Sequence, residues 1–327
     1  YEEVTDVTPD IRITFYNAGH TLGSAITHIN IGNGLHNLVY TADFKFLRTQ
    51  LLEPAVNQFP RVETIIIEST YGAKEDILPA RKLSEDELVN IIKETINSGG
   101  KALIPVLGVG RSQEIMLILE KAIREGMMEK IPVYIQGMVW DITAIHTAYP
   151  NYLNRNIRKS IFHRDHNPFL SDIFIRVGSK KEQDQIIDET GPCIIMATSG
   201  MLTGGASVEY FRRLADNPKN TLIFVNYLGE GSLARRIQNG EKEIQVSGNN
   251  GMEIIKVNMK VKTVAGLSGH ASRTELIRYT ASCEPKPKKV IVVHGEQYKC
   301  LELASYLHKS SRFDTNAPKN LESIRLR

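Results

Sequence analysis

The sequence has 327 residues, 42% of them hydrophobic and 24% charged, as in an ordinary soluble protein with one or two folded domains. The net charge of +3 permits nucleic acid as a partner without indicating it, so any basic groove must be local. No apolar run approaches the roughly 20 residues that span a bilayer, which excludes a membrane protein.

The number of cysteines and the first residue of the sequence lead to two further expectations, one about the cellular compartment and one about the length of the protein. The three cysteines are odd in number and lack C-x-x-C spacing, which argues against a disulfide framework and a thiolate zinc site and favours a reducing cytoplasm. The chain begins at Tyr1, without a signal peptide or an initiator Met. We therefore expect a fragment of a longer chain or a processed product.

The first 70 residues have the pattern of short alternating strands. Gly32 to Gly34 form a turn between two of them, and the run Thr64 to Ile67 is apolar enough for a strand buried on both faces. The predicted strands are residues 11–16, 24–31, 37–40 and 64–67. A β-meander is expected here.

From about residue 82 the pattern changes to strands that alternate with helices. Helices are predicted at 84–98 and 111–125, and strands at 101–106, 133–136, 193–197 and 221–225. This alternation indicates a mostly parallel, doubly wound α/β unit. The chain ends with a strand at 260–265, a helix at 274–282, a strand at 289–293 and a helix at 296–309.

Candidate metal-binding side chains occur at four places, each beside a glycine or after an apolar strand. They are His20, Asp43, His270 and His294. A lone histidine after a strand is more often a hydrogen-bonded structural residue than a ligand. Together, however, imidazole nitrogens and a carboxylate form a ligand set that zinc accepts.

These segments resemble a known family. Gly19 to Ser24 and Thr41 to Phe44 are similar to the third and fourth metal-binding motifs of the metallo-β-lactamase superfamily. Further segments resemble the β-CASP branch of this superfamily. They are the acidic motif at 67–72, the histidine motif at 268–272 and the last motif at 293–296. The segments 105–114 and 197–201, between the acidic and histidine motifs, resemble its inserted domain. The similarity extends to the archaeal homologues of the cleavage and polyadenylation specificity factor endonuclease.

The resemblance implies an α/β fold: a partial metallo-β-lactamase αββα domain, its N-terminal part missing, with an inserted β-CASP parallel α/β domain. The first domain would comprise residues 1–72 and 263–327, and the β-CASP domain residues 73–262. A structure of this kind brings both ends of the chain to one metal site.

The resemblance also implies roles for the site residues. His20 and His294 would each bind one of two zinc ions, and Asp43 would bridge the pair, which suits phosphodiester hydrolysis. His270 would protonate the leaving oxygen, with Glu68 as its carboxylate partner. The alternatives are hydrogen-bonded polar residues at sheet ends and, for Glu68, a helix or turn cap.

One departure from the family pattern is large. The motif His-x-His-x-Asp-His, which lies upstream of the third motif in the family, is absent. The segment from His163 to His166 imitates it within the inserted unit but has the wrong spacing, and we interpret it as a surface or turn segment. Truncation before Tyr1 is the simplest explanation.

Several residues of the inserted unit are candidates for RNA contact. Free amides at a helix start attract phosphate, although a glycine turn between a strand and a helix is equally consistent with turn chemistry alone. The candidates are Gly110, Arg111, Ser199, Gly200, Arg235 and Arg236. In contrast, His28, His36, His146 and His308 lie within periodic segments and are expected to be structural.

The resemblance implies a zinc-dependent ribonuclease, endonucleolytic with 5′-exonuclease activity as a second mode, in RNA 3′-end processing, decay or transcription termination. A histidine in the last motif, here His294, is typical of the RNA-acting members. A DNA-processing nuclease and an inactive RNA-binding scaffold are the alternatives. The implied partners are single-stranded RNA, a second copy of the chain, and upstream KH-type domains, and no membrane is expected.

Overall fold

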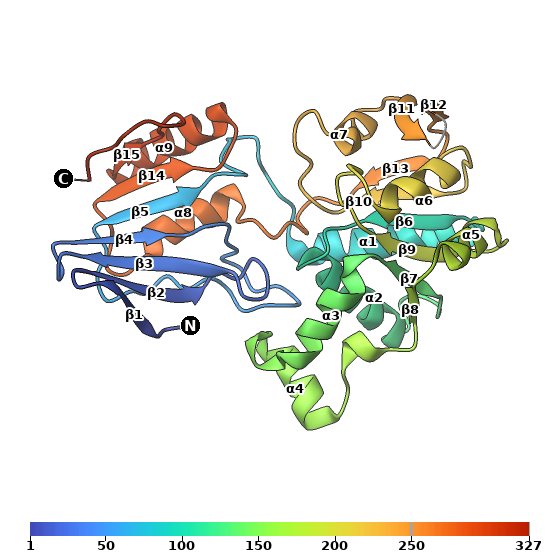
Figure 1. Ribbon diagram of the computed structural model, residues 1–327, viewed down its shortest axis with the longest axis horizontal. Helices are drawn as coiled ribbons and strands as arrows, with labels where there is room; N and C mark the ends of the chain where they lie inside the picture. The colour runs from blue at the N-terminus through green and yellow to red at the C-terminus, as the bar shows by residue number, and fades with distance from the viewer. Residues whose placement is uncertain (249–250, 327) are drawn as a thin grey trace. The chain divides into compact units, whose positions relative to one another are not determined.

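A computed structural model describes residues 1–248 and 251–326, and in it the chain divides into two compact units. The first unit contains Tyr1–Leu78 together with the chain from Gly269 onward, and the second contains Pro79–Ser268. Figure 1 shows the blue N-terminal strands and the red C-terminal strands in one sheet. Both ends of the chain therefore build the same unit. The boundaries between the metallo-β-lactamase and β-CASP domains, predicted from the sequence at residues 72 and 262, stay a prediction.

A seven-stranded sheet forms the first unit, in the order β1-β2-β3-β4-β5-β14-β15. The predicted meander is confirmed as the antiparallel strands β2, β3 and β4, and β5, β14 and β15 continue the sheet in parallel. The strands are β1 (Val4–Thr8), β2 (Ile11–Asn17), β3 (Ala25–Ile31), β4 (His36–Tyr40), β5 (Thr64–Glu68), β14 (Lys289–Val293) and β15 (Asp314–Asn316).

Helices α8 (Arg273–Ser282) and α9 (Gln297–Ser311) pack on this sheet. Leu276 and Tyr279 of α8 share one buried cluster with Leu303 of α9 and with Ile65 and Val290 of the central strands. Burying aliphatic side chains of this kind stabilises a fold by about 1.5–3 kcal/mol each. The apolar runs of β5 and β14 thus fix the strands whose ends carry the polar residues described below.

The second unit holds a six-stranded sheet in the order β13-β10-β6-β9-β7-β8, with all neighbours parallel. The parallel α/β unit predicted from the sequence is confirmed. Its strands are β6 (Lys101–Pro105), β7 (Val133–Gln136), β8 (Phe174–Val177), β9 (Cys193–Ala197), β10 (Thr221–Phe224) and β13 (Lys260–Thr263). The three central strands β6, β9 and β10 are buried throughout, as continuous apolar runs predict.

Helices and a hairpin complete the second unit. The helices are α1 (Arg81–Asn97), α2 (Arg111–Arg124), α3 (Met138–Ala148), α4 (Arg155–Arg164), α5 (Lys180–Asp188), α6 (Ala206–Leu214) and α7 (Leu233–Gln238), with 3₁₀ turns η1 (Pro150–Tyr152) and η2 (Pro168–Leu170). The hairpin pairs β11 (Glu243–Gly248) with β12 (Gly251–Lys256). Among the described residues, no helix is both long and apolar enough to cross a membrane. The three cysteines are free thiols.

Candidate metal centre

Four potential metal ligands converge at one edge of the first unit's sheet. The ligand atoms of Asp43, Glu68, His270 and His294 all lie within 4.8 Å of one another. The register explains three of them: β5 and β14 pair in parallel with Glu68 opposite Val293, and β4 runs parallel to β5. Parallel strands present their carboxyl ends at the same edge, so the residues that follow β4 and β14 meet the end of β5.

Unusual backbone conformations turn two of these side chains at the edge. Ala42, just before Asp43, has a φ of 48°, and His294 itself has a φ of 51°. Non-glycine residues in this region cost free energy and concentrate at functional sites. Next to His294, a Cβ on Gly295 would lie 2.5 Å from the Ser69 hydroxyl, so only glycine fits there. The backbone at Ala42 and His294 is thus strained where it positions Asp43 and His294 in the cluster.

Asp43 and His294 form the open side of the cluster. Their side chains are 39% and 56% exposed, and Asp43 Oδ1 lies 3.2 Å from His294 Nδ1. Two ligand atoms bound to one tetrahedral zinc ion at about 2.0–2.1 Å are themselves about 3.3 Å apart. The spacing and the imidazole-carboxylate chemistry of the pair therefore fit a zinc ion at this position.

Glu68 and His270 form the buried side. His270 Nδ1 donates to Glu68 Oε2 at 2.9 Å, and the Phe44 amide donates to Glu68 Oε1 at 3.0 Å. Burial alone would raise the pKa of Glu68, but hydrogen bonds and the charge of His270 outweigh it and hold the pKa below its ordinary value. Glu68 is thus an ionised carboxylate that orients the His270 ring. It caps no helix.

His20 lies beside this cluster rather than within the four-residue set. Its ring centroid is 4.7 Å from that of His270, and its Nδ1 donates to the Gly269 carbonyl at 2.9 Å. A carbonyl fixes the proton on Nδ1, which makes Nε2 the nitrogen suited to bind a metal. Gly19 has a φ of 69°, and a Cβ there would lie 2.7 Å from the Lys45 carbonyl. The loop that carries His20 is therefore closely packed.

A buried ion pair ties the Asp43 loop to the His270 loop. Lys45 and Glu275 are both 4% exposed, and Lys45 Nζ lies 2.8 Å from Glu275 Oε2. The same ammonium donates to the His270 carbonyl at 2.9 Å. The amides of Leu47 and Ser272 donate to the Glu275 carboxylate, each at 2.9 Å. This pair was not predicted from the sequence, although Ser272 and Glu275 have the spacing of a helix capping box.

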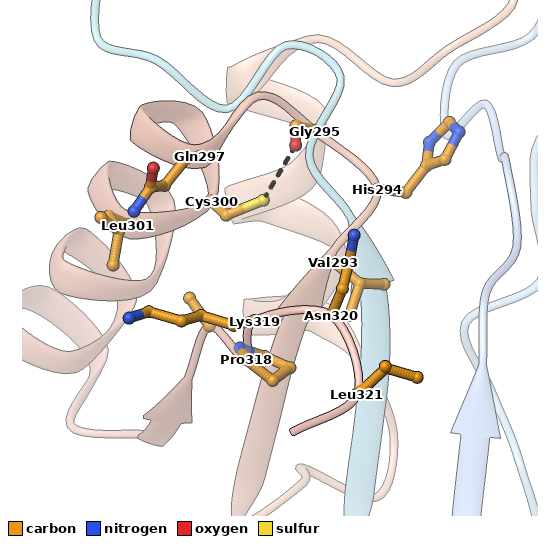
Figure 2. Close-up of a pocket in the computed structure, with 11 residues that line it drawn as sticks. Val293, His294, Gly295, Gln297, Cys300, Leu301, Pro318, Lys319, Asn320 and Leu321 are labelled. Atoms are coloured by element: carbon orange, nitrogen blue, oxygen red, sulfur yellow. Dashed lines mark hydrogen bonds between the residues drawn. The ribbon is translucent and has the colours of Figure 1, made fainter. Parts of the chain in front are cut away.

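A cavity of about 900 Å³ adjoins His294. Figure 2 shows it between the first turn of α9 and the C-terminal segment, with Gln297 and Leu301 on the helix side and Lys319 and Leu321 on the other. Its lining mixes apolar side chains with amide and ammonium groups. The space beside the candidate metal ligand is therefore open to a polar molecule.

The candidates for RNA contact lie in the second unit and fall into different environments. Gly110, Ser199 and Gly200 follow β6 and β9 at the carboxyl edge of the parallel sheet. Arg111 instead turns inward: it is 4% exposed and its Nη1 donates to the Leu267 carbonyl at 2.8 Å. This burial favours a structural role for Arg111.

Two of these candidates, Arg235 and Arg236, lie on α7, and each has a partner. Arg235 donates to Gln238 at 2.7 Å, and Arg236 pairs with Glu241 at 2.5 Å. RNA contact by the six residues remains a prediction. The four histidines expected to be structural each bond to a backbone carbonyl or a hydroxyl: His28, His36, His146 and His308.

Comparisons with known proteins agree with this architecture. Residues 112–237 match the Beta-Casp domain, and residues 254–318 match the Zn-dependent metallo-hydrolase RNA specificity domain. A transcription termination factor FttA from Thermococcus kodakarensis is 53% identical over 100% of this chain and 50% of its own length. The corresponding proteins of Methanothermobacter thermautotrophicus and a Lokiarchaeum are 52% and 48% identical, over 100% and 99% of this chain. The chain spans about half the length of these curated relatives.

Proposed function

The chain belongs to the β-CASP family of metallo-β-lactamase-fold hydrolases, and on that premise we propose that it forms part of the core of a zinc-dependent ribonuclease. The convergence of Asp43, Glu68, His270 and His294 within 4.8 Å is the observation that carries this proposal. The relatives named as transcription termination factors support a role in forming RNA 3′ ends. The activity is that of an endonuclease, with 5′-exonuclease action as a second mode, in the cytoplasm.

Zinc binding is assigned to His294, Asp43 and His20. The 3.2 Å spacing of the first two supports a shared ion, and His20, whose ring centroid lies 4.7 Å from that of His270, is assigned to a second. When bound, zinc supplies Lewis-acid chemistry that neutralises negative charge on the attacked phosphate. Asp43 is assigned to both ions.

Proton delivery is assigned to His270. Its Nδ1 proton is held by Glu68, so the opposite nitrogen, Nε2, is the one that carries a proton to the leaving oxygen. The ionised Glu68 stabilises the protonated imidazole and fixes its plane, as a buried carboxylate does for a catalytic histidine. Glu68 therefore acts as a positioning residue and His270 as the proton donor.

The site assigned here is incomplete without further chain. Its three zinc ligands leave at least one ion short of three protein ligands. We assign the missing ligands to a His-x-His-x-Asp-His motif in the upstream half of the protein, which would also carry KH-type domains. We assign residues 1–72 and 263–327 to the metallo-β-lactamase domain and residues 73–262 to the β-CASP domain. We assign the whole protein to a homodimer.

A comparison of substrates tests the proposal. The complete protein, loaded with zinc, should cleave single-stranded RNA and leave DNA of the same sequence intact. Cleavage of DNA at an equal rate would favour a DNA-processing nuclease, and zinc binding without cleavage of either would favour an inactive scaffold. His294→Ala serves as the control, because it should lose zinc and cleavage together.

A further inference from the structure

Helix α4 of the second unit carries a concentrated positive charge. Its ten residues, Arg155–Arg164, include three arginines, one lysine and His163, and no acidic residue. Figure 1 shows α4 at the end of the unit, away from the six-stranded sheet. The helix therefore presents its charge outside the sheet edge discussed above.

Little of α4 is used for packing. Ile157 is its only buried residue, and the helix rests on the short turns η1 and η2. Asn154 caps the helix by accepting from the amides of Asn156 and Ile157 at 2.9 and 3.0 Å. Arg155, Lys159 and Phe162 are exposed and recur at the spacing of one helix face. This face is left to solvent.

Two of the positive charges of α4 oppose helix formation. Arg155 and Lys159 are four residues apart, where like charges destabilise a helix, and Arg155 lies at the positive N-terminal end of the helix dipole. Within the described part of the chain, Lys159 forms no ion pair with an acid. An anionic partner would offset the repulsion between Lys159 and Arg155.

Exposed aromatic rings accompany these charges. Tyr149, Tyr152 and Phe162 are 56%, 53% and 55% exposed, and the rings of Tyr149 and Tyr152 have centroids 6.5 Å apart. Basic side chains that follow a phosphate backbone, interleaved with aromatic rings on which bases stack, are the general means of binding single-stranded nucleic acid. An acidic protein would use the charges but has no need of stacking rings.

We infer that Tyr149, Tyr152, Arg155, Lys159 and Phe162 form a basic-aromatic surface that binds single-stranded RNA. The inference rests on the proposed function for the identity of the nucleic acid. The basic groups contact phosphates and so set affinity and its dependence on salt, whereas the rings stack on bases without sequence preference. The surface belongs to the second unit, whereas the metal centre belongs to the first.

The test is a salt titration of RNA binding by the full chain, in EDTA so that no turnover occurs. The variant Arg155→Gln, Lys159→Gln removes two phosphate contacts. The slope of log affinity against log salt should fall by about 1.4, since each contact contributes roughly 0.7 for single strands. A matched control, Lys93→Gln, Lys181→Gln, removes the same charge from exposed sites of the same unit and should keep the wild-type slope.

A local readout accompanies the titration. RNA that contains 4-thiouridine should crosslink on irradiation to the peptide that spans residues 149–164, and the double variant should lose this crosslink while its far-UV circular dichroism is unchanged. Equal slopes for the double variant and the control would overturn the inference, as would crosslinks confined to other peptides. Displacement of the RNA by polyglutamate of equal length, with no crosslink to the rings, would assign the surface to an acidic protein instead. Cleavage is measured separately, so a wild-type protein that binds RNA here without cutting it overturns only the proposed function.

Discussion

The buried Lys45–Glu275 pair gives a prediction whose size can be worked out from the structure. In Lys45→Met the apolar part of the side chain is kept, but the ammonium that lies 2.8 Å from Glu275 is lost. Glu275 then keeps the amides of Leu47 and Ser272 as donors to a charge that is 4% exposed. Breaking such a pair from one side costs about 3–5 kcal/mol.

This cost is a large fraction of the roughly 5–15 kcal/mol that stabilises a folded protein. It should lower the melting temperature by roughly 10 °C. Thermal unfolding followed by circular dichroism, together with urea titration, measures the loss. The substitution also removes the donor to the His270 carbonyl, so kcat for RNA should fall while KM changes little.

The double variant Lys45→Met, Glu275→Met separates the two effects. It leaves no unpaired buried charge, so most of the lost stability should return, less the helix cap that Glu275 provides. Activity should stay low, because the contact that holds the His270 loop is still absent. The reasoning is refuted if Lys45→Met melts at the wild-type temperature, or if the double variant recovers activity along with stability.

Three further predictions concern the proton donor, the extent of the active site and the response to acid. His270→Ala in the complete protein should lose about 10²–10⁴-fold in cleavage rate while metal analysis finds wild-type zinc; zinc lost in step with activity would make His270 a ligand. The 327-residue chain alone should bind zinc weakly and cleave RNA slowly beside a chain extended upstream through His-x-His-x-Asp-His; equal turnover would mean that the site is already complete. Burial lowers the pKa of His146, so the stability gained from its neutral form is present above pH 6.5 and lost as the pH falls below it. Melting temperatures at pH 7.5 and 5.5 should therefore differ less in His146→Phe than in the wild type. An unchanged difference would show that His146 does not cause the loss of stability in acid.

The sequence predicted the parts of the fold that have a strong apolar signal. Strands β5, β6, β9 and β10 are buried on both faces, and such runs are recognisable without a structure. Strand β1 was missed, because all five of its residues are exposed and give no alternating pattern. Glu68 and His270 were paired from the family resemblance, and the structure places them 2.9 Å apart.

Other features depend on contacts that no local pattern contains. Lys45 and Glu275 are 230 residues apart in the chain, and their pairing follows only from the way α8 packs beneath the sheet. Arg111 begins a helix after a glycine turn, as a phosphate-binding residue does, yet its partner is the carbonyl of Leu267. The direction of a long side chain is set by such tertiary partners, which the sequence around it does not reveal.

The central claim is that the cluster at the end of β4, β5 and β14 is a zinc centre. Anomalous diffraction at the zinc edge, from crystals of the complete protein grown with zinc, tests it most directly. The account predicts an anomalous peak within about 2.3 Å of both His294 Nδ1 and Asp43 Oδ1, with His270 outside bonding distance. Zinc bound elsewhere, with no peak between His294 and Asp43, would contradict it.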